Sequence, residues 1–272
     1  MKINPAIHKI LTSLVVVKRI FTKPAYAKLL KLLYKYGSLP RFTETIIKFD
    51  NTKFIVPDAA SFLSTYEELI YHEIYTFNNN NDTPVIVDFG ANIGLSVYFW
   101  QKKYPKATIH AYEADPYIYK YLIKNTQTPP PERQNLYLYN NAVHDKNTTL
   151  HFASDHADGG HIANTGTKIQ AIDAAEILSK LPHIDMLKID IEGSERVVIP
   201  RIAPYLRKVD NIFIEYHSEE NKPQCLAEIL TILQEAGFRI HMQPVSSAEK
   251  PLIETKCNSG FDLQVNIWGK RQ

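Results

Sequence analysis

The chain has little of what marks a secreted, membrane-spanning or zinc-binding protein. Its 272 residues include only two cysteines and ten glycines. Cys225 and Cys257 are not in CxxC spacing, so neither a disulfide framework nor a zinc site is indicated. No apolar run approaches the roughly 20 residues that span a bilayer. We therefore expect a cytoplasmic globular protein with both thiols reduced.

Acidic residues are absent from residues 1–41, which carry nine lysines and arginines. This segment also holds two apolar runs, ILTSLVVVKRIF and AKLLKLLYKY, and lacks the small-residue cleavage site of a signal peptide. We predict a helical arm that caps the main domain and turns its lysines to water. The alternative is an arm that lies on an anionic membrane, which would place the protein at the membrane periphery.

Strand and helix patterns alternate from Val85 onward. The strand patterns VIVDFG, TIHAYEA, LYLYNNAV, MLKIDIEG and NIFIEYH are separated by helical segments. The last two, FRIHMQP and FDLQVNIWG, leave no room for a helix between them, so they must be antiparallel. This order predicts an α/β, doubly wound sheet. The expected parts are a basic arm at 1–41, a strand pair and helix at 42–84, and a main domain at 85–272 with an insertion at 145–182.

Local signals predict where several elements begin. An Asp-Asn pair between IIKF and TKFIV predicts a turn between two short strands. A capping-box pattern, Ser64 with Glu67 or Thr65 with Glu68, predicts a helix over LIYHEIYTF. An Asp-Pro pair before YIYKYLIKN predicts the N-cap and first turn of another helix.

The stretch VIVDFGANIG indicates a ligand site, because a buried strand that runs into a glycine turn and a helix commonly carries one. An NAD-binding turn needs G-x-G-x-x-G, but Asn92 and Leu95 occupy its second and third glycine positions. A P-loop needs a lysine directly after its second glycine, and none follows Gly94. A nicotinamide-dependent oxidoreductase is therefore a weaker alternative.

The same residues suit a ligand that has an amino-acid part and a ribose but no phosphate. Asp88, at the end of its strand, can hold an ammonium group directly or through water. Gly90 and Gly94 let the backbone turn and approach the ligand. Glu113, at the end of the next strand, is placed to accept hydrogen bonds from both ribose hydroxyls. We predict S-adenosylmethionine as the cofactor.

Five blocks, VDFGANIGLSVYFW, HAYEADP, NNAV, MLKIDIEGSE and IFIEYH, resemble in order those of the FkbM-type family of methyltransferases. The resemblance covers residues 54–269 and leaves out the arm before Pro40. It implies a seven-stranded, Rossmann-like class I methyltransferase sheet of order 3-2-1-4-5-7-6, with the last strand antiparallel. It also implies methyl transfer to a hydroxyl oxygen. By resemblance, the cofactor-binding residues are Asp88, Gly90, Asn92 and Gly94 beside the methionine and ribose, Glu113 beside the ribose, and Asn141 and Ala142 beside the adenine.

Methyl transfer requires an aligned acceptor oxygen and a base that removes its proton. The fourth and fifth strands of the predicted sheet end in KIDIEGSE and IEYHSEE, beside the expected sulfonium. We predict His217 as the base, since its unperturbed pKa lies nearest to neutral pH. We predict that Asp190 holds the substrate or the cofactor ammonium and that Glu192 accepts backbone hydrogen bonds at the next helix, with Glu215 a further catalytic candidate.

We predict no resident metal; a divalent cation held by Asp190, Glu215 and His217 is a weaker alternative. The expected acceptor is a hydroxyl of a sugar, a glycolipid or a secondary metabolite, and no nucleic acid. The basic arm motivates a second hypothesis, a non-catalytic protein that binds a membrane surface or a partner. In the loop SDHADGGHIANTG we expect a surface position, with His161 a better contact candidate than His156.

Overall fold

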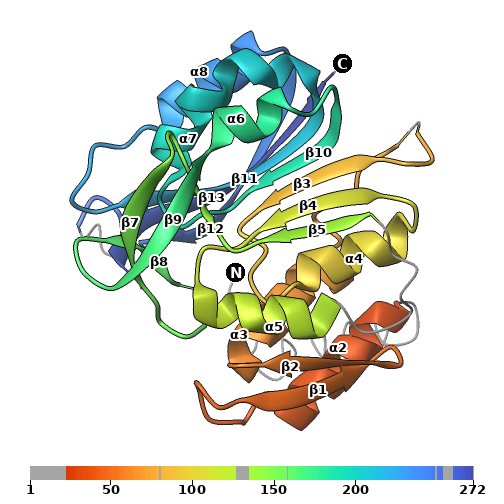
Figure 1. Cartoon of the computed structure of the whole chain (residues 1–272). Coiled ribbons are helices and arrows are strands. Elements are labelled where there is room, and N and C mark those ends of the chain that lie inside the picture. Colours follow the sequence, from red (N-terminus) through yellow and green to blue (C-terminus); the bar gives the residue numbers. More distant parts are fainter. Residues whose placement is uncertain are drawn as a thin grey trace, which may run out of the picture. The chain divides into compact units, whose positions relative to one another are not determined.

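The computed structural model describes residues 23–79, 81–126, 135–157, 159–248, 250–253 and 260–271. The chain forms two compact units, Met1–Ile74 and Tyr75–Gln272, which Figure 1 shows in red to orange and in yellow to blue. The run ILTSLVVVKRIF of the predicted arm and Cys257 lie outside the described residues.

The first unit contains a helix, a hairpin and a second helix. Its elements are α2 (Pro24–Tyr36), β1 (Thr45–Phe49), β2 (Thr52–Val56), α3 (Ala59–Tyr66) and the π-helical turn η1 (Glu67–Tyr71). Helix α2 buries Leu29, Leu32 and Tyr36, while its lysines are exposed, as expected for a helix with one apolar face. Within the described part of the chain, the helices are all too short or too polar to cross a bilayer.

The predicted turn between β1 and β2 is confirmed, because Asp50 and Asn51 both have positive φ and close an antiparallel hairpin. The predicted start of the next helix is wrong. Helix α3 begins at Ala59, and Asp58 caps it by accepting a hydrogen bond from the Ala60 N–H at 3.2 Å. The buried Asp58 is also paired with Arg41, so this cap is stronger than the capping box inferred farther along the chain.

The second unit is built on a seven-stranded sheet of order β12-β13-β11-β10-β3-β4-β5. Six strands run in the same direction, and β13 is antiparallel to both of its neighbours, β11 and β12. This is the predicted order 3-2-1-4-5-7-6. The strands are β3 (Val85–Phe89), β4 (Thr108–Tyr112), β5 (Leu136–Tyr139), β10 (Ile184–Ile189), β11 (Val209–Glu219), β12 (Phe238–Ser247) and β13 (Phe261–Arg271).

Helices cover both faces of this sheet. Figure 1 shows α4 (Leu95–Lys103) and α5 (Pro116–Thr126) on one face. On the other face lie α6 (Ala174–Ser179), α7 (Glu195–Ile202), the 3-10 turn η2 (Ala203–Lys208) and α8 (Leu226–Glu235). Tyr75 stacks on Trp100 and contacts Phe213 within the second unit.

The insertion forms a second sheet of order β6-β9-β7-β8. Its strands are β6 (Ala142–His144), β7 (Thr148–Ala153), β8 (His161–Ala163) and β9 (Thr167–Asp173). The prediction of one strand over LYLYNNAV is therefore wrong: the chain leaves β5 after Tyr139 and pairs with β9 from Ala142 onward. Because β5 runs parallel to its neighbour β4, this sheet begins at the carboxyl edge of the main sheet.

Gly90, directly after β3, needs to be glycine for two reasons. Its φ is +88°, and a Cβ atom there would lie 1.9 Å from the carbonyl oxygen of Asp190. We expect Gly90→Ala to lower the free energy of unfolding by about 3 kcal/mol, because strain and a backbone clash add.

The matched control is Gly260→Ala, since Gly260 has φ +84° with open space around its Cβ position. Strain alone should cost this variant about 1 kcal/mol. Urea unfolding of both variants measures the difference, and equal losses would disprove the clash.

Candidate functional site

The carboxyl ends of β3 and β10 lie side by side and form the centre of the site. The two strands are parallel neighbours, with Ile189 opposite Phe89. The N–H of Asp190 donates to the carbonyl of Phe89 at 3.1 Å, so the turn after β10 lies against the glycine turn after β3. Ligands of doubly wound sheets bind at this edge.

Lys188 of β10 is buried at this edge between two carboxylates. Its Nζ lies 3.4 Å from Asp88 Oδ1 and 3.1 Å from Asp190 Oδ2, and it donates to the carbonyl of Gly90. Burial alone would lower the pKa of Lys188, but Asp190 and Asp88 outweigh burial and raise it. Lys188 is therefore an ammonium at neutral pH.

This lysine changes the interpretation of Asp88. The Asp88 side chain is fully buried, and its Oδ2 accepts a hydrogen bond from the Ser96 hydroxyl at 2.6 Å. Burial raises the pKa of Asp88, although the nearby Lys188 lowers it. The ammonium partner of Asp88 is thus supplied by the protein itself. Among the described residues, Oδ1 receives no well-oriented hydrogen bond, although Lys188 Nζ lies 3.4 Å from it.

Glu113 fastens the glycine turn to the end of β4. Its Oε2 accepts from the N–H of Asn92 and its Oε1 from the N–H of Asp115, both at 2.8 Å. Burial raises the pKa of Glu113 to about 7, and the two backbone hydrogen bonds lower it by less. Each carboxylate oxygen keeps a second acceptor position, so Glu113 remains able to accept from a ligand.

The other predicted cofactor residues contact the protein as follows. Asn92 has φ +47°, and its Oδ1 accepts from the N–H of Ile93 at 2.6 Å. Gly94 permits close packing against α5, because a Cβ there would lie 2.6 Å from Thr126 Cγ2. Asn141 donates to the carbonyl of Gln170 at 3.4 Å, and Ala142 is buried in β6.

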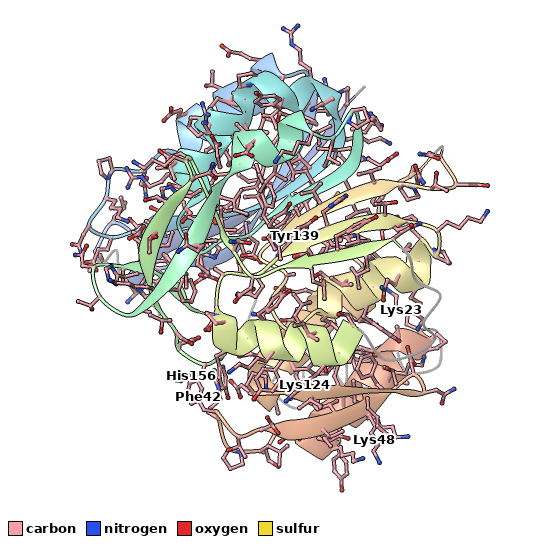
Figure 2. The ribbon with its side chains drawn as sticks, viewed as in Figure 1. Lys23, Phe42, Lys48, Lys124, Tyr139 and His156 are labelled. Carbon is pink, nitrogen blue, oxygen red and sulfur yellow. The ribbon has the colours of Figure 1, made fainter. Side chains whose placement is uncertain are left out.

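One polar neighbour of Glu113 is absent from the sequence interpretation. Asn140, at the break between β5 and β6, donates to the carbonyl of Glu113 at 2.9 Å. Beside it, Tyr139 (Figure 2) stacks on Tyr112 with ring centroids 4.5 Å apart. The switch of the chain between two sheets places these groups, and the sequence did not predict that switch.

His217 of β11 lies in a cage of carboxylates. Its Nδ1 is 3.4 Å from Glu195 Oε1, and its Nε2 is 3.5 Å from Glu192 Oε2 and 3.6 Å from Glu215 Oε1. Burial alone would lower the pKa of His217, but these three carboxylates raise it well above the ordinary value. A protonated imidazole has no lone pair to take a proton, so this environment favours the acid form of His217; its predicted role as base stays a prediction.

Glu195 performs the backbone role that we predicted for Glu192. It is fully buried, and its two oxygens accept from the N–H groups of Ile191 and Gly193, both at 2.9 Å. Glu192 instead occupies the turn itself, with φ +52° and a partly exposed side chain. A glutamate at the first residue of the helix, six positions after the buried strand ends, is the signal that would have indicated this.

Two groups of side chains have metal-ligand geometry. The candidate ligand atoms of Asp190, Glu192 and His217 all lie within 4.8 Å of one another. This set has Glu192 where the sequence-based alternative had Glu215.

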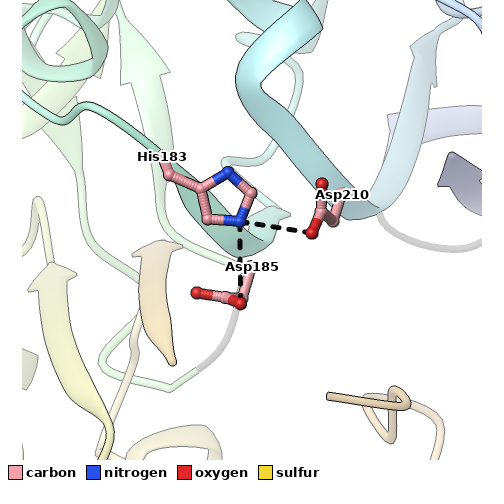
Figure 3. Close-up of side chains that lie close together, drawn as sticks. All are labelled: His183, Asp185 and Asp210. Carbon is pink, nitrogen blue, oxygen red and sulfur yellow. Dashed lines mark ion pairs between the residues drawn. The ribbon is translucent and has the colours of Figure 1, made fainter. Parts of the chain in front are cut away.

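The second group, His183, Asp185 and Asp210, lies at the opposite edge of the sheet, where β10 and β11 begin (Figure 3). His183 Nε2 is 3.2 Å from Asp210 Oδ2 and 3.7 Å from Asp185 Oδ1. Asp185 also accepts a hydrogen bond from the N–H of Val85 at 2.7 Å, so this group connects the beginnings of β3, β10 and β11.

The loop between β7 and β8 is attached to the start of α5. Ser154 hydrogen-bonds to Asp115, and His156 (Figure 2) packs edge-on against Tyr117 at 4.7 Å between centroids. His161 is exposed, and its Nδ1 lies 3.2 Å from the carbonyl oxygen of Gly159. The predicted ligand contact of His161 stays a prediction.

Comparisons with known proteins identify the family of this chain. A family model described as the methyltransferase FkbM domain matches residues 88–240, which include every predicted site residue. The chain is 25% identical to methyltransferase sdnD of Sordaria araneosa, over 73% of this chain and 90% of that protein.

Two solved structures are also similar to the chain, at low identity. Methyltransferase FkbM from Methylobacillus flagellatus KT has a TM-score of 0.47 at 14% identity, covering 93% of this chain and 60% of that chain. M. jannaschii TYW2 in complex with AdoMet has a TM-score of 0.41 at 17% identity, covering 86% of this chain and 89% of that chain.

The ion pair between Lys188 and Asp88 gives a direct stability prediction. Lys188→Met leaves a buried carboxylate without its counter-charge, and we expect the free energy of unfolding to fall by about 3–5 kcal/mol. In the double variant Asp88→Asn/Lys188→Met both charges are gone, so the loss should be smaller than the sum of the two single losses. Urea unfolding of all four proteins measures this coupling. Strict additivity would show that the two groups do not stabilise each other.

Proposed function

The chain belongs to the FkbM methyltransferase family, and from this premise we propose that it methylates a hydroxyl oxygen of a sugar, a glycolipid or a secondary metabolite. Family membership bears out the resemblance of the five sequence blocks and, with it, S-adenosylmethionine as the cofactor. We propose that the methyl group goes to oxygen, and we propose the class of acceptor and the roles of individual residues.

One observation carries the proposal: the turn that holds the acidic side chains lies against the glycine turn. Asp190 and Lys188 hydrogen-bond to the backbone of Phe89 and Gly90. A base on one turn therefore lies next to a ligand bound on the other. O-methylation needs this proximity, because the acceptor proton must leave beside the reacting methyl group.

The residues at the glycine turn fit the cofactor. When bound, S-adenosylmethionine supplies a methyl group on a positively charged sulfur. Glu113 would hold the ribose hydroxyls through its remaining acceptor positions, and Asp88 is the proposed partner of the methionine part. The other cofactor assignments in this proposal are Gly90, Asn92 and Gly94 for the backbone of the turn, and Asn141 and Ala142 for the adenine.

Glu192 is the proposed proton acceptor. Asp190 is already paired with Lys188 at 3.1 Å, and the surrounding carboxylates raise the pKa of His217, which favours its protonated form. Burial raises the pKa of Glu192 well above its ordinary value, although His217 lowers it, and the side chain is partly exposed. A carboxylate of raised pKa is the stronger base. Asp190 orients the acceptor or the donor ammonium, and Glu215 keeps His217 in place.

The alternative functions have less support. A nicotinamide-dependent oxidoreductase conflicts with family membership. For a membrane-surface protein, the described part of the basic arm offers α2, whose exposed lysines are equally typical of a solvated helix. Calorimetric titration with S-adenosylhomocysteine and with NAD separates the first alternative. A panel of hydroxyl acceptors, incubated with S-adenosylmethionine labelled in its methyl group, then tests for a methyl ether product.

The raised pKa of Glu113 predicts a pH-dependent affinity. The ionised carboxylate accepts from both ribose hydroxyls, so affinity should be full above about pH 7 and lost as the pH falls below it. We expect the Kd for S-adenosylhomocysteine to be about tenfold weaker at pH 6 than at pH 7.5. Glu113→Gln should bind weakly and lose this pH dependence. If the variant matches the native protein at both pH values, Glu113 does not hold the ribose.

For Glu192 we expect a loss of turnover without a loss of cofactor binding. Glu192→Gln removes the base and should lower kcat by about 10²–10⁴-fold, with the Kd for S-adenosylhomocysteine changed less than about threefold. Glu220→Gln, an exposed carboxylate just after β11, is the matched control and should keep native kcat. Both are measured with the acceptor that the panel identifies. Native turnover by Glu192→Gln would assign the base to another residue.

A further inference from the structure

Glu195 is buried beneath the carboxylates of the site, at the first residue of α7, and has no exposed surface. A buried carboxylate is costly unless its oxygens are hydrogen-bonded. Here Oε1 accepts from the N–H of Ile191, Oε2 accepts from the N–H of Gly193, and Oε1 lies 3.4 Å from His217 Nδ1. These contacts engage both oxygens of Glu195 with two partners, the backbone of the turn and the His217 ring.

The first partner of Glu195 is the backbone of the turn that contains Glu192. Ile191 and Gly193 are the residues before and after Glu192, so the two hydrogen bonds hold the backbone on both sides of the proposed base. Glu192 and Gly193 have φ of +52° and +94°, and a non-glycine residue in this region is strained by about 1–2 kcal/mol. Two charge-assisted hydrogen bonds to Glu195 are strong enough to hold that conformation.

The second partner of Glu195 is His217, whose ring lies between Glu195 and Glu192. One ring nitrogen faces Glu195, and the other lies 3.5 Å from Glu192 Oε2 and 3.6 Å from Glu215 Oε1. The ring also packs against Phe261, with centroids 5.0 Å apart. A protonated ring between carboxylates attracts those on both sides, so its orientation influences where the Glu192 carboxylate lies.

We infer that Glu195 is a positioning residue, which holds Glu192 in place through the backbone of its turn and through the ring of His217. This inference rests on the proposed function, in which Glu192 takes the acceptor proton. Glu195 itself is fully buried, so it cannot contact the acceptor and acts only through Glu192 and His217. It therefore affects the rate of methyl transfer more than the binding of cofactor.

The test compares Glu195→Gln with the native protein. Glutamine replaces one acceptor oxygen by an NH₂ group that faces a backbone N–H, so one of the two hydrogen bonds to the turn is lost. We expect kcat to fall about 10–100-fold, with the Kd for S-adenosylhomocysteine changed less than about threefold. In NMR, amide exchange at Ile191 and Gly193 should accelerate at least about tenfold, and the His217 imidazolium should lose its proton at lower pH.

Two variants show whether the effect is specific. Glu195→Asp keeps the charge and should recover part of the lost kcat, which a merely space-filling role would not allow. Glu228→Gln, on the exposed face of α8, is the matched control and should behave as the native protein. If Glu195→Gln does not fold, His217→Gln tests the second contact alone and should lower kcat with little effect on the Kd.

Native kcat and native protection of Ile191 and Gly193 in Glu195→Gln would overturn the inference. The same holds if both Glu195→Gln and His217→Gln keep native kcat. Failure of the proposed function has a different outcome: the native protein itself would bind no S-adenosylhomocysteine and methylate no acceptor. The exchange rates and the His217 titration would still test the geometry in that case.

Discussion

The site depends on one buried cation, Lys188, held between Asp88 and Asp190 at the point where β3 and β10 end. An ammonium group removed from water is stable only with close counter-charges, and both strands supply one. Its hydrogen bond to the Gly90 carbonyl also fixes the first residue of the glycine turn. The position of the turn after β3 is therefore set by a side chain from the neighbouring strand.

A second cation, protonated His217, organises the other half of the site in the same way. The two positive groups lie among five carboxylates, Asp88, Asp190, Glu192, Glu195 and Glu215. This excess of negative charge suits a positively charged methyl donor, and it raises the proton affinity of the least compensated carboxylate. The buried charges thus have two effects: they fix the geometry, and they leave Glu192 with the properties of a base.

Much of the fold could be predicted because its signals are local. Apolar strand patterns, the turn residues at Asp50 and Asn51 and the cap at Asp115 each depend on a few adjacent residues, and the structure confirms them. Two predictions failed where a distant partner decided the outcome. Helix α3 starts at the Asp58 cap, which Arg41 supports, and the strand after Tyr139 ends because Ala142 pairs with β9.

For the site, the sequence by itself determined which residues gather at the carboxyl edge of the sheet, because parallel strands bring their ends together whatever their packing. It also identified the family, through blocks that include each of these ends. Only the tertiary structure decided what those residues do. Lys188 and Asp88 are 100 positions apart in the chain but opposite each other in the sheet, and His217 meets Glu195 only across β11 and α7. Protonation depends on such distances and on burial, and neither can be read from the order of residues.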